Sequence, residues 1–403
     1  MRILFLTHRL PYAPNRGDRI RAYYLLREMS RFARVSLFSL AHDAEEAGHV
    51  TEMPFADHVR CVRVPRLRNM VRAAASLPSS APLTHSLLRS PDARRTIEDM
   101  VSAARPDVVL AYCSGMAKLA LAPPLNAWPL VVDLVDVDSE KWRQLAGATW
   151  GARRWIYQRE ARTLARFEVS LAQASRAILV INAREHASLR RLSPDAPIRI
   201  VENGIEGAAF SPPADPWPSP TVVFCGILDY YPNEAGVRWF VTDVWPRVKS
   251  ARPDAMFVIV GGGRSDRLRA LTGADPSIRI TGPVPRVQPY LWDAAVSVAP
   301  LHLGRGLQNK VLEALAAGLP VVVTPSVLDG VPAEAHPGCV AADSPEDFAA
   351  AVIDLLGRGP EERRRLARSS RLDGLDWSHR FASLEGILSG EPAPGGSPND
   401  VHP

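Results

Sequence analysis

Residues 304–325 read GRGLQNKVLEALAAGLPVVVTP and contain one complete helix–strand unit. Apolar residues recur at helical spacing over 307–317, and Gly318 and Pro320 mark the end of that helix. The three valines that follow predict a short, fully buried strand. Helices that alternate with such strands are typical of a parallel sheet that is covered on both faces.

The same alternation runs through the whole chain. In the first half, short apolar and β-branched runs predict strands at 1–7, 34–40, 59–64, 107–112, 129–136 and 176–181. In the second half, such runs predict strands at 221–227, 255–263, 277–282, 296–301, 319–324 and 339–342. Helix-length segments lie between most of them. The sequence therefore predicts an α/β protein built from two Rossmann-like, doubly wound parallel sheets.

A proline-rich segment at 201–220 separates the two halves and predicts a linker. We expect an N-terminal, acceptor-side domain at 1–205 and a C-terminal, nucleotide-binding domain at 206–375, which face each other across a cleft. A terminal helix at 376–390 is expected to pack back on the N-terminal domain. The Pro/Gly-rich tail at 391–403 is expected to be disordered.

Composition narrows the class of protein. No apolar run is long enough to span a membrane, and the first residues lack a signal-peptide pattern. The four cysteines are far apart and have no metal-ligand spacing. The chain has a net charge of +5, with 30 basic against 20 acidic residues in 1–205 and 18 against 23 in 206–403. We expect a cytoplasmic enzyme without a metal or cofactor, whose first domain meets an anionic partner.

Residues 60–95 carry much of that positive charge. They contain eight arginines, one acidic residue (Asp92) and several interleaved apolar residues. Such a segment is either a solvated helical face or a peripheral contact with the inner-membrane surface. Because it contains no Phe, Tyr or Trp and no known motif, a nucleic-acid partner is not expected.

The helix predicted at 307–317 brings Asn309, Lys310 and Glu313 to one face. A helix start that follows glycines presents free N–H groups, which suit a diphosphate, and an ammonium group is a common phosphate partner. Lys310 is one of only 4 lysines beside 44 arginines. Glu313 could accept hydrogen bonds from ribose hydroxyls. The alternative is a surface Lys–Glu pair of little consequence.

Six segments resemble, in order, the retaining GT-B glycosyltransferases of family 4 (group 1): 11–31, 201–210, 226–240, 258–263, 280–301 and 299–325. This resemblance implies the GT-B fold and transfer of a sugar from a nucleotide-diphosphate sugar, with no cofactor and no bound metal. DLVDVDSEKW at 133–142 and the QNK variant more narrowly resemble the sugar transferases of PEP-CTERM/exosortase exopolysaccharide systems. That subfamily implies a lipid-linked glycan acceptor.

The resemblance also implies roles for single residues. Glu313 matches the second glutamate of the family's E-x7-E motif, which binds the ribose, whereas the first glutamate is replaced by Arg305. The arginine and lysine that usually hold the diphosphate are replaced by Ile227 and Asn233. Our hypothesis is that Arg305 and Lys310 supply the missing positive charge.

The full predicted donor set adds main-chain and loop positions to these residues. It consists of Gly17, Arg19, Gly226, Gly282, Val284, Arg305, Gly306, Asn309, Lys310 and Glu313. Each glycine could instead be a simple strand-end turn, and Arg19 a surface residue at a helix start.

Asp136 and His8 are the candidate catalytic residues, because each follows a predicted strand and could orient an acceptor hydroxyl. Asp136 and Asp138 form a DxD pattern, but a metal role is not expected; Asp138 or Ser139 could equally cap a helix. The sequence shows no nucleophile set, which fits a transfer that relies on positioning. Two alternatives remain: a 2-epimerase-type isomerase of the same fold, and a degenerate nucleotide-sugar-binding partner.

Overall fold

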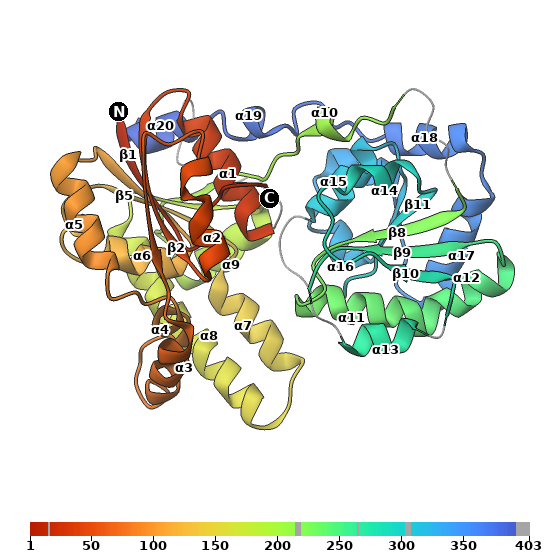
Figure 1. The fold of residues 1–403 in the computed structure, drawn as a ribbon, viewed down its shortest axis with the longest axis horizontal. Helices are drawn as coiled ribbons and strands as arrows, with labels where there is room; N and C mark the ends of the chain where they lie inside the picture. The colour runs from red at the N-terminus through yellow and green to blue at the C-terminus, as the bar shows by residue number, and fades with distance from the viewer. Residues whose placement is uncertain (15–16, 214–218, 264–265, 274, 303–307, 392–403) are drawn as a thin grey trace. The chain divides into compact units, whose positions relative to one another are not determined.

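The computed structural model describes residues 1–14, 17–213, 219–263, 266–273, 275–302 and 308–391. The chain forms two compact units (Figure 1). Unit 1 comprises Met1–Glu202 and the chain from Arg380 onward, and unit 2 is Asn203–His379. The predicted domain limits lie within a few residues of these boundaries. Residues 392–403 of the predicted tail lie outside the described residues.

Unit 1 holds a parallel sheet of seven strands among the described residues, in the order β3-β2-β1-β4-β5-β6-β7. The strands are β1 (Arg2–Thr7), β2 (Arg34–Ala41), β3 (His58–Arg63), β4 (Val108–Tyr112), β5 (Leu130–Val135), β6 (Ala177–Val180) and β7 (Ile198–Ile200). The helices are α1 (Gly17–Met29), α2 (Ala44–Gly48), α3 (Arg66–Ala75), α4 (Leu83–Leu87), α5 (Ala93–Ala103), α6 (Ser114–Ala120), α7 (Asp138–Gly147), α8 (Gly151–Ala174), α9 (Ala183–Leu192) and α20 (Leu384–Ser389).

Unit 2 holds a second parallel sheet, with six strands in the order β10-β9-β8-β11-β12-β13 in its described part. The strands are β8 (Thr221–Cys225), β9 (Met256–Val260), β10 (Ile278–Ile280), β11 (Val296–Ala299), β12 (Val321–Val323) and β13 (Cys339–Ala341). The helices are α10 (Gly207–Phe210), α11 (Tyr231–Trp239), α12 (Trp245–Ala251), α13 (Asp266–Thr272), α14 (Gln288–Trp292), α15 (Asn309–Ala316), α16 (Pro325–Leu328), α17 (Pro345–Gly357), α18 (Pro360–Arg368) and α19 (Trp377–Arg380).

The two doubly wound parallel sheets confirm the predicted fold class. Central strands such as β4 and β8 are buried along their whole length, as the uninterrupted apolar runs predict. In each sheet the strand order reverses once, between β1 and β4 in unit 1 and between β8 and β11 in unit 2. Loops that leave such a pair of strands run to opposite faces, so a ligand can bind between them.

Three local predictions differ from the structure. The strand expected to reach residue 263 ends at Val260, because Gly261 has a φ of +147°. β7 was not predicted, since it has only three residues and two of them are exposed. The terminal segment forms two short helices, α19 and α20, rather than one. Phe381 lies between them, is buried, and places its ring 5.3 Å from the guanidinium carbon of Arg21.

The cysteines and the helices add two further observations. All four cysteines are free. None of the helices in the described ranges is both long and apolar enough to cross a membrane.

A fully buried ion pair connects the first helix of unit 1 to its central sheet. Nε of Arg21 on α1 donates to Oδ2 of Asp133 on β5 at 2.7 Å, and the two side chains are 1% and 0% exposed. The second carboxylate oxygen accepts a hydrogen bond from the backbone N–H of Val135. Loss of one partner therefore leaves a buried charge without compensation.

We predict that Arg21→Met destabilises unit 1 by about 3–5 kcal/mol, because the Asp133 carboxylate is then buried unpaired. Thermal and denaturant unfolding, followed by a probe in unit 1, measure the change. The exposed pair Arg94–Glu98 provides the control, and Arg94→Met should cost at most about 0.5 kcal/mol. Equal effects of Arg21→Met and Arg94→Met would contradict the conclusion that loss of Arg21 leaves a buried, uncompensated charge.

Candidate functional site

Three loops that follow β8, β9 and β10 meet through their main chains in unit 2. The N–H of Gly226 donates to the carbonyl of Val260 at 2.9 Å, and Gly261 pairs with Gly282 in an isolated bridge. A Cβ on Gly261 would lie 2.0 Å from the carbonyl oxygen of Gly226. Gly261 and Gly282 also have positive φ values. Gly261 and Gly282 therefore occupy positions that favour glycine. The three loops bring their main-chain groups together at the carboxyl ends of the strands.

Lys310 lies at the start of α15, and its ammonium group reaches Asn233 on α11, the helix that follows β8. Its Nζ donates to Oδ1 of Asn233 at 2.7 Å and lies 4.5 Å from the centre of the Phe224 ring. Asn233 is buried, and its amide nitrogen donates to the carbonyl of Ile227 at 2.8 Å. The strand reversal between β8 and β11 thus brings a cation from α15 against the position that the family resemblance assigns to a lysine, here Asn233.

Burial shifts the titration of both charged side chains on α15. Burial lowers the pKa of the Lys310 ammonium to about 8, against a smaller opposing effect of Cys225 and Glu313. Burial raises the pKa of the Glu313 carboxyl to about 7, and Lys310 opposes this shift. Both residues keep part of their surface accessible. Between these described residues there is no ion pair, so the alternative of a surface Lys–Glu bridge is not what the structure contains.

Asn309 is the first residue of α15, and its side-chain oxygen is buried. No described residue donates a hydrogen bond to this oxygen. A buried acceptor without a donor is costly, so this oxygen is suited to a hydroxyl or N–H group of a ligand.

The other predicted donor residues are placed differently. Gly17 begins α1, and Val284 packs against the core of unit 2. Arg19 is buried: its guanidinium donates to Oε1 of Glu46 and to the hydroxyl of Tyr12, each at 3.0 Å. Arg19 therefore connects α1 to α2 and to the segment after β1, and its donor role stays a prediction. Arg305 and Gly306 lie outside the described residues.

The two candidate catalytic residues both lie at carboxyl ends of strands in unit 1. His8 follows β1, and its ring stacks on the Tyr112 ring at the end of β4, with centroids 5.7 Å apart. Asp136 directly follows β5. His8 and Tyr112 therefore mark the strand reversal of unit 1, as Lys310 marks that of unit 2.

The start of α7 contains buried polar pairs that sequence reasoning missed. Asp138 accepts a hydrogen bond from Ser114, and Ser139 donates to Glu168, each at 2.5 Å. Burial raises the pKa of the Asp138 carboxyl, and it raises the pKa of Glu168 to about 8. The idea that Asp138 or Ser139 caps the helix is wrong, because the N-cap is Val137. Spacing could not reveal these pairs, since their partners are distant in sequence.

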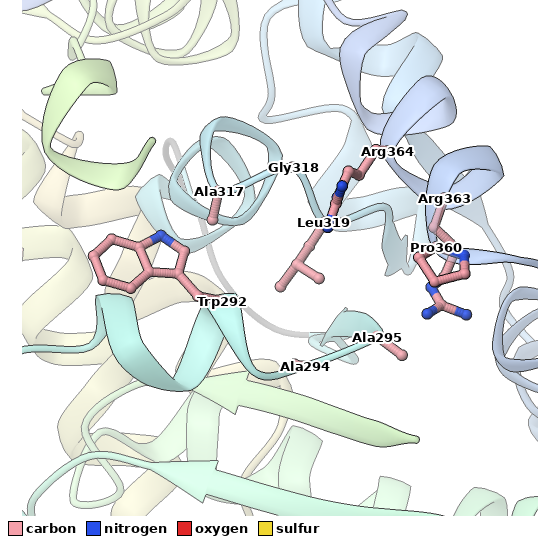
Figure 2. A pocket seen from close by; sticks show the side chains of 9 residues that line it. All are labelled: Trp292, Ala294, Ala295, Ala317, Gly318, Leu319, Pro360, Arg363 and Arg364. Carbon is pink, nitrogen blue, oxygen red and sulfur yellow. The ribbon is translucent and has the colours of Figure 1, made fainter. Parts of the chain in front are cut away.

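The hollow in Figure 2 lies away from the candidate site around Lys310. No group of three or more His, Cys, Asp or Glu residues in the described ranges could hold a metal ion. The hollow in Figure 2 lies at the other end of α15, beside Gly318, and Ala295 on its wall directly precedes β11. It is therefore at the amino ends of the strands, whereas Lys310 is at the carboxyl ends.

Comparison with known proteins places these features in context. Residues 219–358 match the family described as "Glycosyl transferases group 1", and this stretch lies within unit 2. No curated protein sequence matches the chain.

Solved structures resemble the chain over nearly its whole length. Sucrose-phosphate synthase from Thermosynechococcus elongatus has a TM-score of 0.72 at 17% identity, over 96% of this chain and 98% of that one. Anabaena HepE, solved with UDP-glucose, has a TM-score of 0.68 at 13% identity, over 96% and 99%. WaaG, a glycosyltransferase of lipopolysaccharide biosynthesis, has a TM-score of 0.60 at 15% identity, over 96% and 100%. These likenesses establish the GT-B fold.

We predict that the amine of Lys310 titrates near pH 8 in the folded protein, because burial disfavours its charged form. Only the neutral amine reacts with acetic anhydride, so peptide-level mass spectrometry of labelling against pH gives the midpoint. In the denatured chain the midpoint of the same lysine should move to about 10.4. The same midpoint in folded and denatured protein would contradict the burial of this ammonium group.

Proposed function

Because this glycosyltransferase has the GT-B fold, we propose that it transfers a sugar, with retention of configuration, from a nucleotide-diphosphate sugar bound at α15 of unit 2. The observation that carries the proposal is the 2.7 Å hydrogen bond from Lys310 to Asn233. It places an ammonium group at the one point where the family resemblance expects a diphosphate-binding lysine and this chain has an amide instead.

Lys310 is the group proposed to neutralise the diphosphate. The ammonium is held between the Asn233 oxygen and the Phe224 ring, neither of which carries a compensating negative charge. Burial, which Cys225 and Glu313 oppose only in part, makes its charged form costly in the free protein. A diphosphate would remove that cost, so the binding free energy of the donor includes the stabilisation of this charge. Arg305 is proposed as a second cation.

The neighbouring groups are proposed to bind the rest of the nucleotide. Glu313, one turn after Lys310, would accept hydrogen bonds from the ribose hydroxyls. The unpaired oxygen of Asn309 would accept one more hydrogen bond from the donor. Main-chain groups at Gly226 and Gly282 would approach the phosphates and the base, because glycine has no side chain of its own to keep a ligand away.

Catalysis is proposed to rest on positioning and charge stabilisation. The bond between the anomeric carbon of the sugar and the β-phosphate oxygen breaks, and the acceptor oxygen forms a new bond to that carbon on the same face. Lys310 would stabilise the negative charge that develops on the departing diphosphate. A donor phosphate oxygen would take the proton of the acceptor hydroxyl. Asp136 and His8 are the residues of unit 1 proposed to orient an acceptor hydroxyl.

The acceptor is proposed to be a lipid-linked glycan of exopolysaccharide biosynthesis. This proposal rests on the resemblance of 133–142 and of the QNK variant to PEP-CTERM/exosortase-associated sugar transferases. It agrees in kind with WaaG, whose described role is in the biosynthesis of another surface polysaccharide.

We predict that the protein releases a nucleoside diphosphate from one nucleotide-sugar only when an acceptor is present. A panel of nucleotide-sugars, incubated with membrane-lipid extracts and assayed for released nucleotide, tests this expectation. An epimerised donor without release would favour the isomerase alternative. Binding of a donor with no turnover, whichever acceptor is added, would favour the alternative of a degenerate nucleotide-sugar-binding partner.

We predict that Lys310→Met weakens donor binding by about 100-fold, because the diphosphate then meets a neutral pocket. Isothermal titration calorimetry measures the affinity, and the surface lysine change Lys249→Met is the matched control. Affinity of the unchanged protein should fall roughly tenfold from pH 7.5 to 9, as Lys310 loses its proton above its pKa of about 8. Lys310→Arg should remove this pH dependence, because guanidinium stays protonated. Equal pH profiles of donor affinity for the unchanged protein and for Lys310→Arg would refute the proposed role of Lys310 in donor binding.

A further inference from the structure

Helix α3 of unit 1 is folded with its apolar side facing outward. Leu67, Met70 and Val71 are 81%, 61% and 72% exposed, although they lie at the i, i+3, i+4 spacing of a helical stripe. The residues that α3 buries are Asn69 and Ala73. An amphipathic helix in a globular protein normally turns its apolar stripe to the core, so this orientation has to be enforced and requires an explanation.

The side chain of Asn69 fixes that orientation. Its amide nitrogen donates to the carbonyl of Leu87 at 2.9 Å and to that of Arg89 at 2.7 Å, both next to α4. Its oxygen accepts a hydrogen bond from Arg72 at 2.9 Å. Rotation of α3 to bury its leucine and valine would break the two bonds to the carbonyls of Leu87 and Arg89 and leave the buried amide nitrogen unpaired. The outward apolar face is therefore a specified feature of the fold.

Helix α8 holds the segment that joins α3 to α4. The guanidinium of Arg159 donates to the carbonyls of Leu77, Ser76, Ser79 and Ala81. The carboxylate of Glu160 accepts hydrogen bonds from the backbone N–H groups of Leu83 and Thr84, each at 2.8 Å. Figure 1 shows α3, α4 and the start of α8 at the same end of unit 1.

Two exposed tryptophans lie at the start of α8. Trp150 is 82% and Trp155 is 52% exposed. Trp155 precedes Arg159, which binds the segment between α3 and α4, by four positions. Both side chains therefore project from the same face of α8, one turn apart. The guanidinium carbon of Arg154 lies 6.0 Å from the centre of the Trp150 ring. Arg159 thus connects the segment after α3 to the helix that begins beside these tryptophans.

The sequence segments that carry both features are rich in basic residues. Residues 64–91 contain four arginines and no acidic residue, and residues 141–159 contain five basic residues and no acidic residue. Exposed aliphatic side chains on one helix, exposed tryptophans at the start of another and arginines in both segments are the combination that binds at a membrane interface. There the arginines meet lipid phosphates and the aliphatic groups enter the acyl boundary.

We propose that α3 and the start of α8 dock unit 1 on an anionic lipid bilayer. Leu67, Met70 and Val71 enter the interface, and Trp150 and Trp155 lie at the level of the headgroups. A second copy of the chain fits this surface poorly, because a symmetric contact would bring the same arginines together. Nucleic acid fits poorly as well, since its backbone offers nothing to the exposed aliphatic groups.

The docking surface is independent of the donor site proposed above. It lies in unit 1 and contains none of the residues assigned to donor binding or catalysis. A lipid-linked acceptor would make docking useful, but vesicle binding needs neither donor nor acceptor. The two proposals can therefore fail separately.

Flotation of the full chain with vesicles tests the proposal. The unchanged protein should float with vesicles of phosphatidylcholine containing about one third phosphatidylglycerol, and should stay unbound with phosphatidylcholine alone. The variant Leu67→Gln/Met70→Gln/Val71→Gln should bind at least about tenfold more weakly. Trp150→Gln/Trp155→Gln should weaken binding at least about threefold.

The matched control is Ile200→Gln/Leu271→Gln, which changes two exposed apolar residues (44% and 39%) outside this surface and should float like the unchanged protein. The α3 variant should keep its thermal midpoint and donor affinity, because the three side chains are exposed. Equal flotation of the α3 variant and the unchanged protein would overturn the proposal, as would no flotation of the unchanged protein. A concentration-dependent dimer that only the α3 variant abolishes, without vesicle binding, would assign the surface to a second copy instead.

Discussion

The parallel pairing of β8 with β9 on one side and β11 on the other is the constraint on which the candidate site depends. Because the chain leaves β8 and β11 toward opposite faces, a gap opens at their carboxyl ends. The loop after β8 contributes Gly226, helix α11 after that loop contributes Asn233, and the segment after β11 leads to α15 and Lys310. The 2.7 Å contact between Lys310 and Asn233 is a direct consequence of that topology.

Under the proposed function, the charge that binds the donor comes from a different chain segment than in the family that the sequence resembles. Where the family resemblance expects a lysine after β8, this chain has Asn233 on α11, and the ammonium group beside it comes from α15. A diphosphate would respond to the location of that charge and not to the element that carries it. The low pKa of Lys310 follows from its burial in this arrangement, which the smaller opposing effects of Cys225 and Glu313 do not offset.

Unit 1 uses buried polar groups for two different purposes. Arg21 and Asp133 connect α1 to the sheet, and Asn69, Arg159 and Glu160 fix helices at the surface. Burial of such groups has an unfavourable desolvation free energy, so their presence in a fold is weak evidence for added stability. For Asn69, the effect is on orientation, because its buried amide keeps the aliphatic side chains of α3 in the solvent.

The sequence by itself determined the fold class, almost all strands, and the assignment of Lys310 and Glu313 to one helix, because these depend on apolar runs and on helical spacing. It also determined that residues 60–95 are basic and apolar at once. Only the tertiary structure decided that Lys310 donates a hydrogen bond to Asn233, that Arg19 forms an ion pair with Glu46, and that α3 turns its apolar side outward. Spacing cannot fix these contacts, because each joins residues from separate elements whose approach is set by sheet order and by buried polar bonds.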